Sequence, residues 1–101
     1  MSVVHIVMFR FKEENKEGNI AKVKAMLEAL PEKIPSLRSM EVGVDFLHSE
    51  RSMDLVLTST FDDREGLDAY RVHPAHVEVV NVIKEVTQES RVVDYEKGGD
   101  A

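Results

Sequence analysis

The sequence contains no cysteine among its 101 residues. This absence excludes disulfide bonds, thiolate metal sites and a cysteine nucleophile, and it agrees with a reducing compartment. Basic residues are not in excess either, because 13 Lys and Arg stand against 19 Asp and Glu and give a net charge of −6. A nucleic-acid binder needs a basic patch that neutralises phosphates, so we expect no nucleic-acid partner.

Long apolar runs are also missing. The N-terminal stretch MSVVHIVMFRFK is apolar only between Val3 and Phe11, and His5 and Arg10 interrupt it. A membrane-spanning helix needs about 20 apolar residues, and a signal peptide needs a basic leader and a small-residue cleavage site. We therefore expect a cytoplasmic protein without membrane contact. At this length, residues 1–101 are expected to form a single domain around one core.

The first apolar segment is typical of a β-strand, since β-branched and aromatic residues prevail in it. Both of its faces are apolar, so we expect a central strand that is covered on both sides. The protein's own helices can cover one face, whereas the other face needs a different cover. The two faces carry Val3, His5, Val7, Phe9 and Phe11 on one side and Val4, Ile6 and Met8 on the other.

Apolar residues at helical spacing predict a helix over residues 17–30, with Asn15 as its N-cap and Pro31 at its end. Residues 31–37 (PEKIPSL) have the prolines of a loop. Alternating apolar and polar residues then predict two strands, over 40–46 and 54–61, which form a hairpin.

Two further helical segments and a strand complete the chain. Asp62 and Asp63 can cap a short helix that runs through Tyr70, and Pro74 suits the first turn of the next helix. Residues 91–95 (RVVDY) predict a last strand, and residues 97–101 a flexible tail. The apolar stripe expected on the last helix consists of Val77, Val80, Ile83 and Val86.

The predicted order is β-α-β-β-α-β, with the second helix broken before Pro74. Right-handed crossovers then give an α+β fold of the ferredoxin-like kind, a four-stranded antiparallel sheet with its helices on one face. The other face would be an exposed apolar patch, which usually marks an interface. A second copy, sheet against sheet, covers it most economically, so we expect a homodimer in the form of an α+β barrel. We assign Val4, Ile6 and Met8 to that interface if His5 faces the helices.

The stretch AYRVHPAHVEVV places Tyr70, His73 and His76 close together. His73 precedes a proline and is therefore expected to stay outside the helix and to begin it. The spacing His73-x-x-His76 also has the look of a metal pair, but a site of this kind needs at least three converging ligands. Only Asp68 and Glu78 are near in sequence, so we expect no bound metal, flavin or haem.

Four segments, HIVMFRFK, PEKIPSLRSMEVGVD, YRVHPAHVEVV and VVDYE, together resemble the stress-responsive A/B barrel (Dabb) family over residues 3–96. The resemblance implies a ferredoxin-like protomer, a homodimeric barrel and a cleft between helices and sheet. One plant branch of the family carries out a cofactor-free aldol condensation of a polyketide. Matched motif by motif, the acid and base groups of that branch fall on His76, Tyr70 and His5.

Several functions stay open at this point. The leading hypothesis is a homodimer that binds a small, mostly apolar ligand in each protomer's cleft. A rival is a cofactor-free cyclase, lyase or isomerase, with His76 as base, Tyr70 as hydrogen-bond donor and His5 beside them. A third is a dimeric-barrel monooxygenase. The ordinary structural interpretation is that all three side chains simply pack in or near the core.

Overall fold

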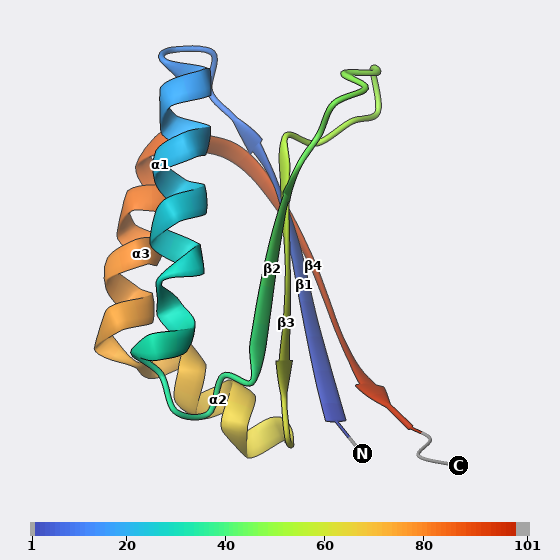
Figure 1. Ribbon diagram of the computed structural model, residues 1–101. Helices are drawn as coiled ribbons and strands as arrows, with labels where there is room; N and C mark the ends of the chain where they lie inside the picture. The colour runs from blue at the N-terminus through green and yellow to red at the C-terminus, as the bar shows by residue number, and fades with distance from the viewer. Residues whose placement is uncertain (1, 99–101) are drawn as a thin grey trace.

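The computed structural model describes residues 2–98, in which four strands and three α-helices form two layers (Figure 1). The expected β-α-β-β-α-β order, with the helical part broken before Pro74, is confirmed. The elements are β1 (Ser2–Phe11), α1 (Lys16–Glu28), the short 3-10 helix η1 (Leu30–Glu32), β2 (Ser39–Val44), β3 (Leu55–Phe61), α2 (Arg64–Val72), α3 (Pro74–Val86) and β4 (Thr87–Lys97).

The sheet is antiparallel throughout, with the strand order β2-β3-β1-β4. The helices all lie on one side of it, as expected for a ferredoxin-like α+β fold (Figure 1). β1 therefore has neighbours on both edges and helices on one face, which agrees with its apolar character on both faces. None of the helices in residues 2–98 has the length and apolar character needed to span a bilayer.

The core lies between the helices and the facing side of the sheet. Two of its members, Ile34 and Leu37, come from the stretch that the sequence suggested was a loop, and both are buried. Their backbone turns back on η1, because the Ile34 amide donates to the Leu30 carbonyl at 3.0 Å. The largest fully buried side chains are Tyr70, Phe11, Phe61, Leu27, Leu30, Ile34, Leu55 and Val23.

The start and end of α1 differ from the prediction. The helix ends at Glu28 rather than at residue 30, and Pro31 lies inside η1. Asn15 does occupy the N-cap position, but it is left-handed, with φ of 49°, and its side chain makes no capping hydrogen bond. Asparagine tolerates this conformation better than most residues, so it serves here as a turn residue.

The buried stripe of α3 was predicted wrongly in one respect. Val77 is 43% exposed, whereas Val79 is only 4% exposed, with Ile83 one turn further on also buried. The turn at His73 sets the rotation of the helix about its axis, so the face that meets the core runs through Ala75, Val79 and Ile83. The spacing of apolar residues in the sequence does not predict that rotation.

β4 is longer than the five residues expected for it, and it pairs with β1 along its length. Its first residues are polar and show no apolar alternation, so the sequence did not predict a strand there. They form one nevertheless, because an edge strand can pair through its backbone while its side chains face solvent. Lys97 belongs to this strand, so the prediction of a flexible tail from residue 97 is wrong at that position. The rest of that prediction, from residue 99 to 101, lies outside the described residues.

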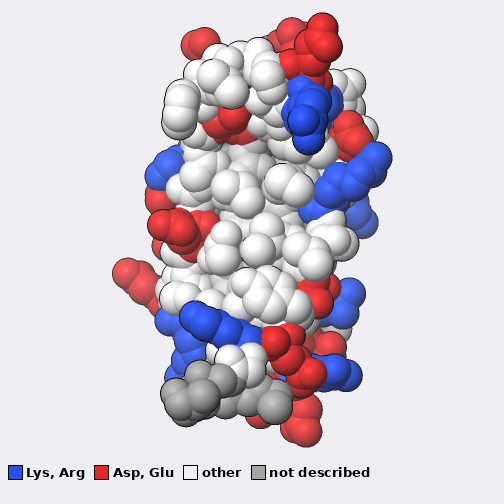
Figure 2. All heavy atoms as spheres, turned by 90° about the vertical axis from the view of Figure 1, so that its right-hand side faces the viewer, with Lys and Arg blue, Asp and Glu red and all other residues white. Residues whose placement is uncertain are grey.

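The sheet face opposite the helices is uncharged at its centre, and the charged side chains lie at its rim (Figure 2). Alternation along β1 places Val4, Ile6 and Met8 on this open face, and His5 on the helix side, as predicted. The open face also carries Val56 of β3 and Val93 and Tyr95 of β4, which stand beside the β1 residues in the strand register, and Met8, Val93 and Tyr95 are exposed.

Candidate functional site

Three rings that are far apart in the sequence lie together on the helix side of the sheet. His5 comes from β1, Tyr70 from the last turn of α2 and His76 from the first turn of α3. The ring centroids of Tyr70 and His76 are 4.2 Å apart, and those of Tyr70 and His5 are 6.2 Å apart with an edge-on geometry. The residues chosen from the sequence therefore form one cluster, with the Phe61 ring packed on Tyr70 at 5.1 Å.

The break between α2 and α3 brings Tyr70 and His76 together. His73 is extended, with φ of −63° and ψ of 134°, as expected for a residue before proline. Its Nδ1 accepts a hydrogen bond from the Ala75 amide at 3.1 Å, so its side chain caps α3. The prediction that His73 begins this helix is confirmed. Because Pro74 stops α2 from continuing as a straight helix, His76 folds back onto the Tyr70 ring.

The Tyr70 hydroxyl is the unusual atom of the cluster. The Tyr70 side chain is fully buried, and its hydroxyl has no hydrogen-bond partner among residues 2–98. Buried polar atoms are nearly always paired, so an unpaired one needs an explanation. Burial also raises the pKa of Tyr70 far above its usual value of 10, so the hydroxyl keeps its proton at neutral pH. The Tyr70 hydroxyl is therefore a buried hydrogen-bond donor without an acceptor among residues 2–98.

His76 is held in one tautomer. Its Nδ1 lies 3.1 Å from the Arg71 carbonyl oxygen, which can only accept, so Nδ1 carries the proton. Burial lowers the pKa of His76 below its usual value of 6.5, more than the hydrogen bond to Arg71 raises it. The ring is thus neutral at pH 7, and its Nε2 keeps a free electron pair. These are the properties of a general base.

His5 is paired with a residue of the neighbouring strand. We expect it to lie within hydrogen-bonding reach of Tyr70, of His76 or of a bridging water, and this stays a prediction. In the structure its Nδ1 is hydrogen-bonded to the Asp94 carboxylate. Asp94 is not among the site residues chosen from the sequence. The strand register sets Asp94 of β4 opposite His5 of β1, and only the register could have revealed this pair.

The cluster adjoins a pocket between α2 and β4. This pocket has a volume of about 400 Å³, with the buried Val3 and Leu67 and the charged Arg71 and Asp94 among its lining residues. Asp94 therefore connects the pocket to His5. Tyr70, His76 and His5 do not line it, so the expectation that Tyr70 and His76 border a common cavity stays a prediction.

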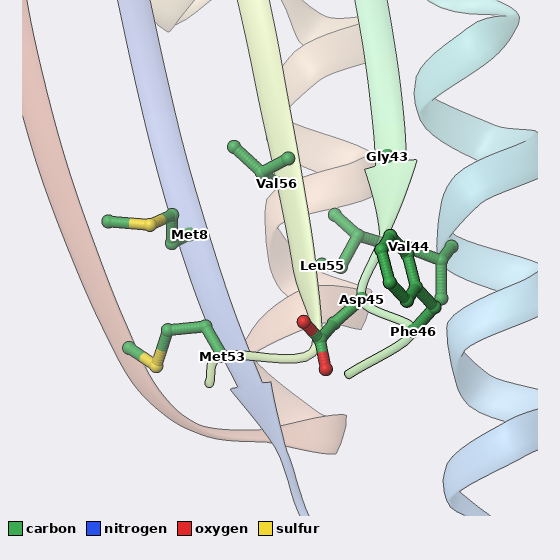
Figure 3. A pocket seen from close by; sticks show the side chains of 8 residues that line it. All are labelled: Met8, Gly43, Val44, Asp45, Phe46, Met53, Leu55 and Val56. Carbon is green, nitrogen blue, oxygen red and sulfur yellow. The ribbon is translucent and has the colours of Figure 1, made fainter. Parts of the chain in front are cut away.

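A second pocket, of about 300 Å³, lies on the open face at the base of the β2–β3 hairpin (Figure 3). Met8, Met53, Phe46 and Val56 are among the apolar side chains that line it. It belongs to the sheet surface that the helices leave uncovered, so it is separate from the ring cluster.

The histidine pair does not form a metal site in this structure. The Nδ1 of His73 is engaged with the Ala75 amide, and the Nδ1 of His76 with the Arg71 carbonyl. Within the described residues, 2–98, no group of three or more His, Asp or Glu side chains is arranged to hold a metal ion. The spacing His73-x-x-His76 is explained by helix capping and by the ring cluster.

Comparison with known proteins identifies the family. The family model of the stress responsive A/B barrel domain matches residues 3–97. The chain belongs to this family. Olivetolic acid cyclase of Cannabis sativa is similar to it with 26% identity, over 94% of this chain and 96% of the cyclase. A stress-response A/B barrel domain-containing protein of Arabidopsis thaliana is 30% identical, over 90% of this chain and 82% of that protein.

A solved structure supports the same assignment. A crystal structure of a dimeric protein from Bacteroides fragilis, of unknown function and ferredoxin-like fold, has a TM-score of 0.87 and 33% identity. The similarity covers 95% of this Dabb chain and 96% of the other. The family and the ferredoxin-like fold expected from the sequence are both confirmed.

The unpaired Tyr70 hydroxyl leads to a stability prediction. Replacing Tyr70 with Phe removes a buried donor that has no partner, so the free energy of unfolding should stay the same or rise by up to about 1–3 kcal/mol. Urea unfolding of the variant and of the unchanged protein measures this difference. A clear loss of stability in Tyr70→Phe would show that the hydroxyl is paired in solution.

The lowered pKa of His76 leads to a pH dependence. The folded protein binds the His76 proton less readily than the unfolded chain does, so the stability from this group is complete above about pH 6.5. It is lost as the pH falls through the folded-state pKa. We expect His76→Asn to lose less stability than the unchanged protein between about pH 7 and pH 5. An NMR titration that gives His76 a pKa of 6.5 or more would contradict the burial argument.

Proposed function

We propose that this Dabb protein is a homodimer that binds a small, mostly apolar ligand between helices and sheet, with a ligand oxygen at the Tyr70 hydroxyl. The unpaired, buried hydroxyl is the observation that carries the proposal. A ligand carbonyl or hydroxyl would supply the missing acceptor, and the apolar surroundings of Tyr70 would suit the rest of a small apolar molecule. The rings of His5 and His76 lie beside the Tyr70 ring.

A second function, cofactor-free acid–base catalysis, is favoured by the tautomer of His76. In this proposal the His76 Nε2 takes a proton from the carbon next to a ligand carbonyl. The electron pair of that C–H bond forms the C=C bond of an enolate, whose oxygen accepts a hydrogen bond from Tyr70. The proton returns from His76 to the carbon when the enolate reverts to the carbonyl compound. The similarity to a cyclase supports this reaction class but does not identify a substrate. No observation on residues 2–98 favours a monooxygenase.

Acetophenone tests both functions with one probe, since it has an apolar ring, a carbonyl and exchangeable α-hydrogens. We expect it to shift the NMR signals of the Tyr70 and His76 rings, and ethylbenzene, which lacks the carbonyl, to shift them less. If the site is catalytic, the protein will speed α-hydrogen exchange in D₂O, and His76→Asn and Tyr70→Phe will each lose most of that rate, roughly 100-fold or more. Binding of acetophenone without faster α-hydrogen exchange would support the ligand-binding function and contradict the catalytic one. If ethylbenzene shifts these NMR signals as much as acetophenone does, the proposed hydrogen bond from the Tyr70 hydroxyl to the ligand is contradicted.

The homodimer is proposed from the open face of the sheet. Met8, Val93 and Tyr95 are exposed there around Ile6, and soluble monomers seldom leave a large contiguous apolar patch in water. Fully burying one large aliphatic side chain contributes about 1.5–3 kcal/mol, so several buried together favour association strongly. The Bacteroides fragilis relative is described as dimeric, which supports the same arrangement here.

Replacing Ile6 with Lys is expected to split the dimer, because an unpaired ammonium group cannot be buried cheaply in the interface. Sedimentation velocity at micromolar concentration should report a dimer for the unchanged protein and a monomer or an unfolded chain for the variant. Val72→Lys, at an exposed apolar position on α2, is the matched control and should remain dimeric. A stable monomer of the unchanged protein would refute the homodimer.

A further inference from the structure

The pocket between α2 and β4 is lined by charged side chains of both signs. One face of α2 forms its wall, because residues three and four positions apart lie together on a helix. The sheet forms its floor, where Val3 of β1 stands beside Glu96 of β4 in the strand register. The lining residues are Arg64, Leu67, Asp68 and Arg71 of α2, Val3 of β1, and Asp94, Tyr95 and Glu96 of β4.

Most of the charges in this pocket are paired within the chain. The Arg64 guanidinium donates a hydrogen bond to the Glu96 carboxylate at 2.9 Å. The Asp94 carboxylate is hydrogen-bonded to His5 on the neighbouring strand, so it also takes part in the ring cluster. These pairs leave two charged side chains of the pocket, one basic and one acidic, and both belong to α2.

These two residues, Arg71 and Asp68, have no close partner. Their nearest charged atoms are 3.9 Å apart, which is too long for a hydrogen bond, and their side chains are 60% and 73% exposed. Within residues 2–98 this long contact is the only ion pair that either side chain forms. An exposed ion pair of this length contributes little to stability, so both groups are available to a ligand.

We propose that this pocket binds a free α-amino acid with an apolar side chain, its carboxylate at Arg71 and its ammonium group at Asp68. Both groups of an amino acid are bonded to one carbon, so they can meet two opposite charges that lie three positions apart on one helix. A guanidinium can bind a carboxylate through two parallel N–H···O bonds, and an ammonium group has three donors for the Asp68 carboxylate. The site is separate from the ring cluster and does not depend on the function proposed above.

The charges and the walls of the pocket favour such a zwitterion over an ion of one sign. A carboxylate without an ammonium group would be attracted by Arg71 but repelled by Asp68, and the reverse holds for a simple amine. Val3 and Leu67, which are 3% and 6% exposed, give the pocket apolar walls for the side chain of the ligand. The pocket volume of about 400 Å³ lies in the range of small-molecule sites. An amino acid such as leucine therefore matches the pocket in charge, polarity and size.

An NMR titration with L-leucine tests the site against two analogues, isocaproate, which lacks the ammonium group, and isopentylamine, which lacks the carboxylate. We expect leucine to shift the backbone amide signals of Leu67 and Arg71. It should bind roughly 10-fold or more tightly than either analogue, because only leucine meets both charges. Arg71→Gln should abolish the advantage of leucine over isopentylamine, and Asp68→Asn its advantage over isocaproate.

Arg51→Gln in the β2–β3 hairpin and Glu65→Gln on α2 are the matched controls. They remove charges of the same signs at exposed positions outside the pocket, and should leave the dissociation constant of leucine within about twofold of that of the unchanged protein. Circular dichroism confirms that each variant is folded. The proposal is overturned if leucine binds no more tightly than the two analogues, or if Arg71→Gln weakens leucine binding no more than Arg51→Gln does.

Discussion

The rest of the structure depends on one strand that is apolar on both faces. β1 lies inside the sheet, and its two sets of side chains divide the molecule into a helix-covered core and an open surface. On the core side, His5 stands among apolar residues and reaches the ring cluster. On the other side, Ile6 and Met8 lie at the centre of the face that we assign to a second copy. Because neighbouring residues in a strand point to opposite faces, the site and the interface are set by alternate positions of one segment.

The break in the helix at His73 and Pro74 sets the relative positions of the site residues. A continuous helix would carry Tyr70 and His76 on different sides, since six positions correspond to about 1.7 turns. The extended His73 instead restarts the helix, and the two rings come into contact. The same local geometry places the Arg71 carbonyl against the His76 ring and so fixes its tautomer. His73, whose side chain caps the helix, thereby positions Tyr70 and His76 against each other.

Much of the fold followed from patterns within short segments. The alternation in β1, β2 and β3 and the proline at residue 74 predicted the order of elements, and the family resemblance selected His5, Tyr70 and His76. The errors arose where a position depends on distant parts of the chain. Val77 was assigned to the core because the rotation of α3 is set by its connection to α2. Asp94 was missed because its partner is far away in the sequence and is reached only through the register of β4 against β1.

The sequence by itself determined the elements, the two-sided character of β1 and the residue types that gather at the site, because these depend on local periodicity and on side-chain chemistry. Only the tertiary structure decided that the Tyr70 hydroxyl is buried without a partner among residues 2–98 and that His5 is paired with Asp94. These properties arise from strand order, register and helix rotation, which bring together residues whose separation along the chain carries no sign of their contact.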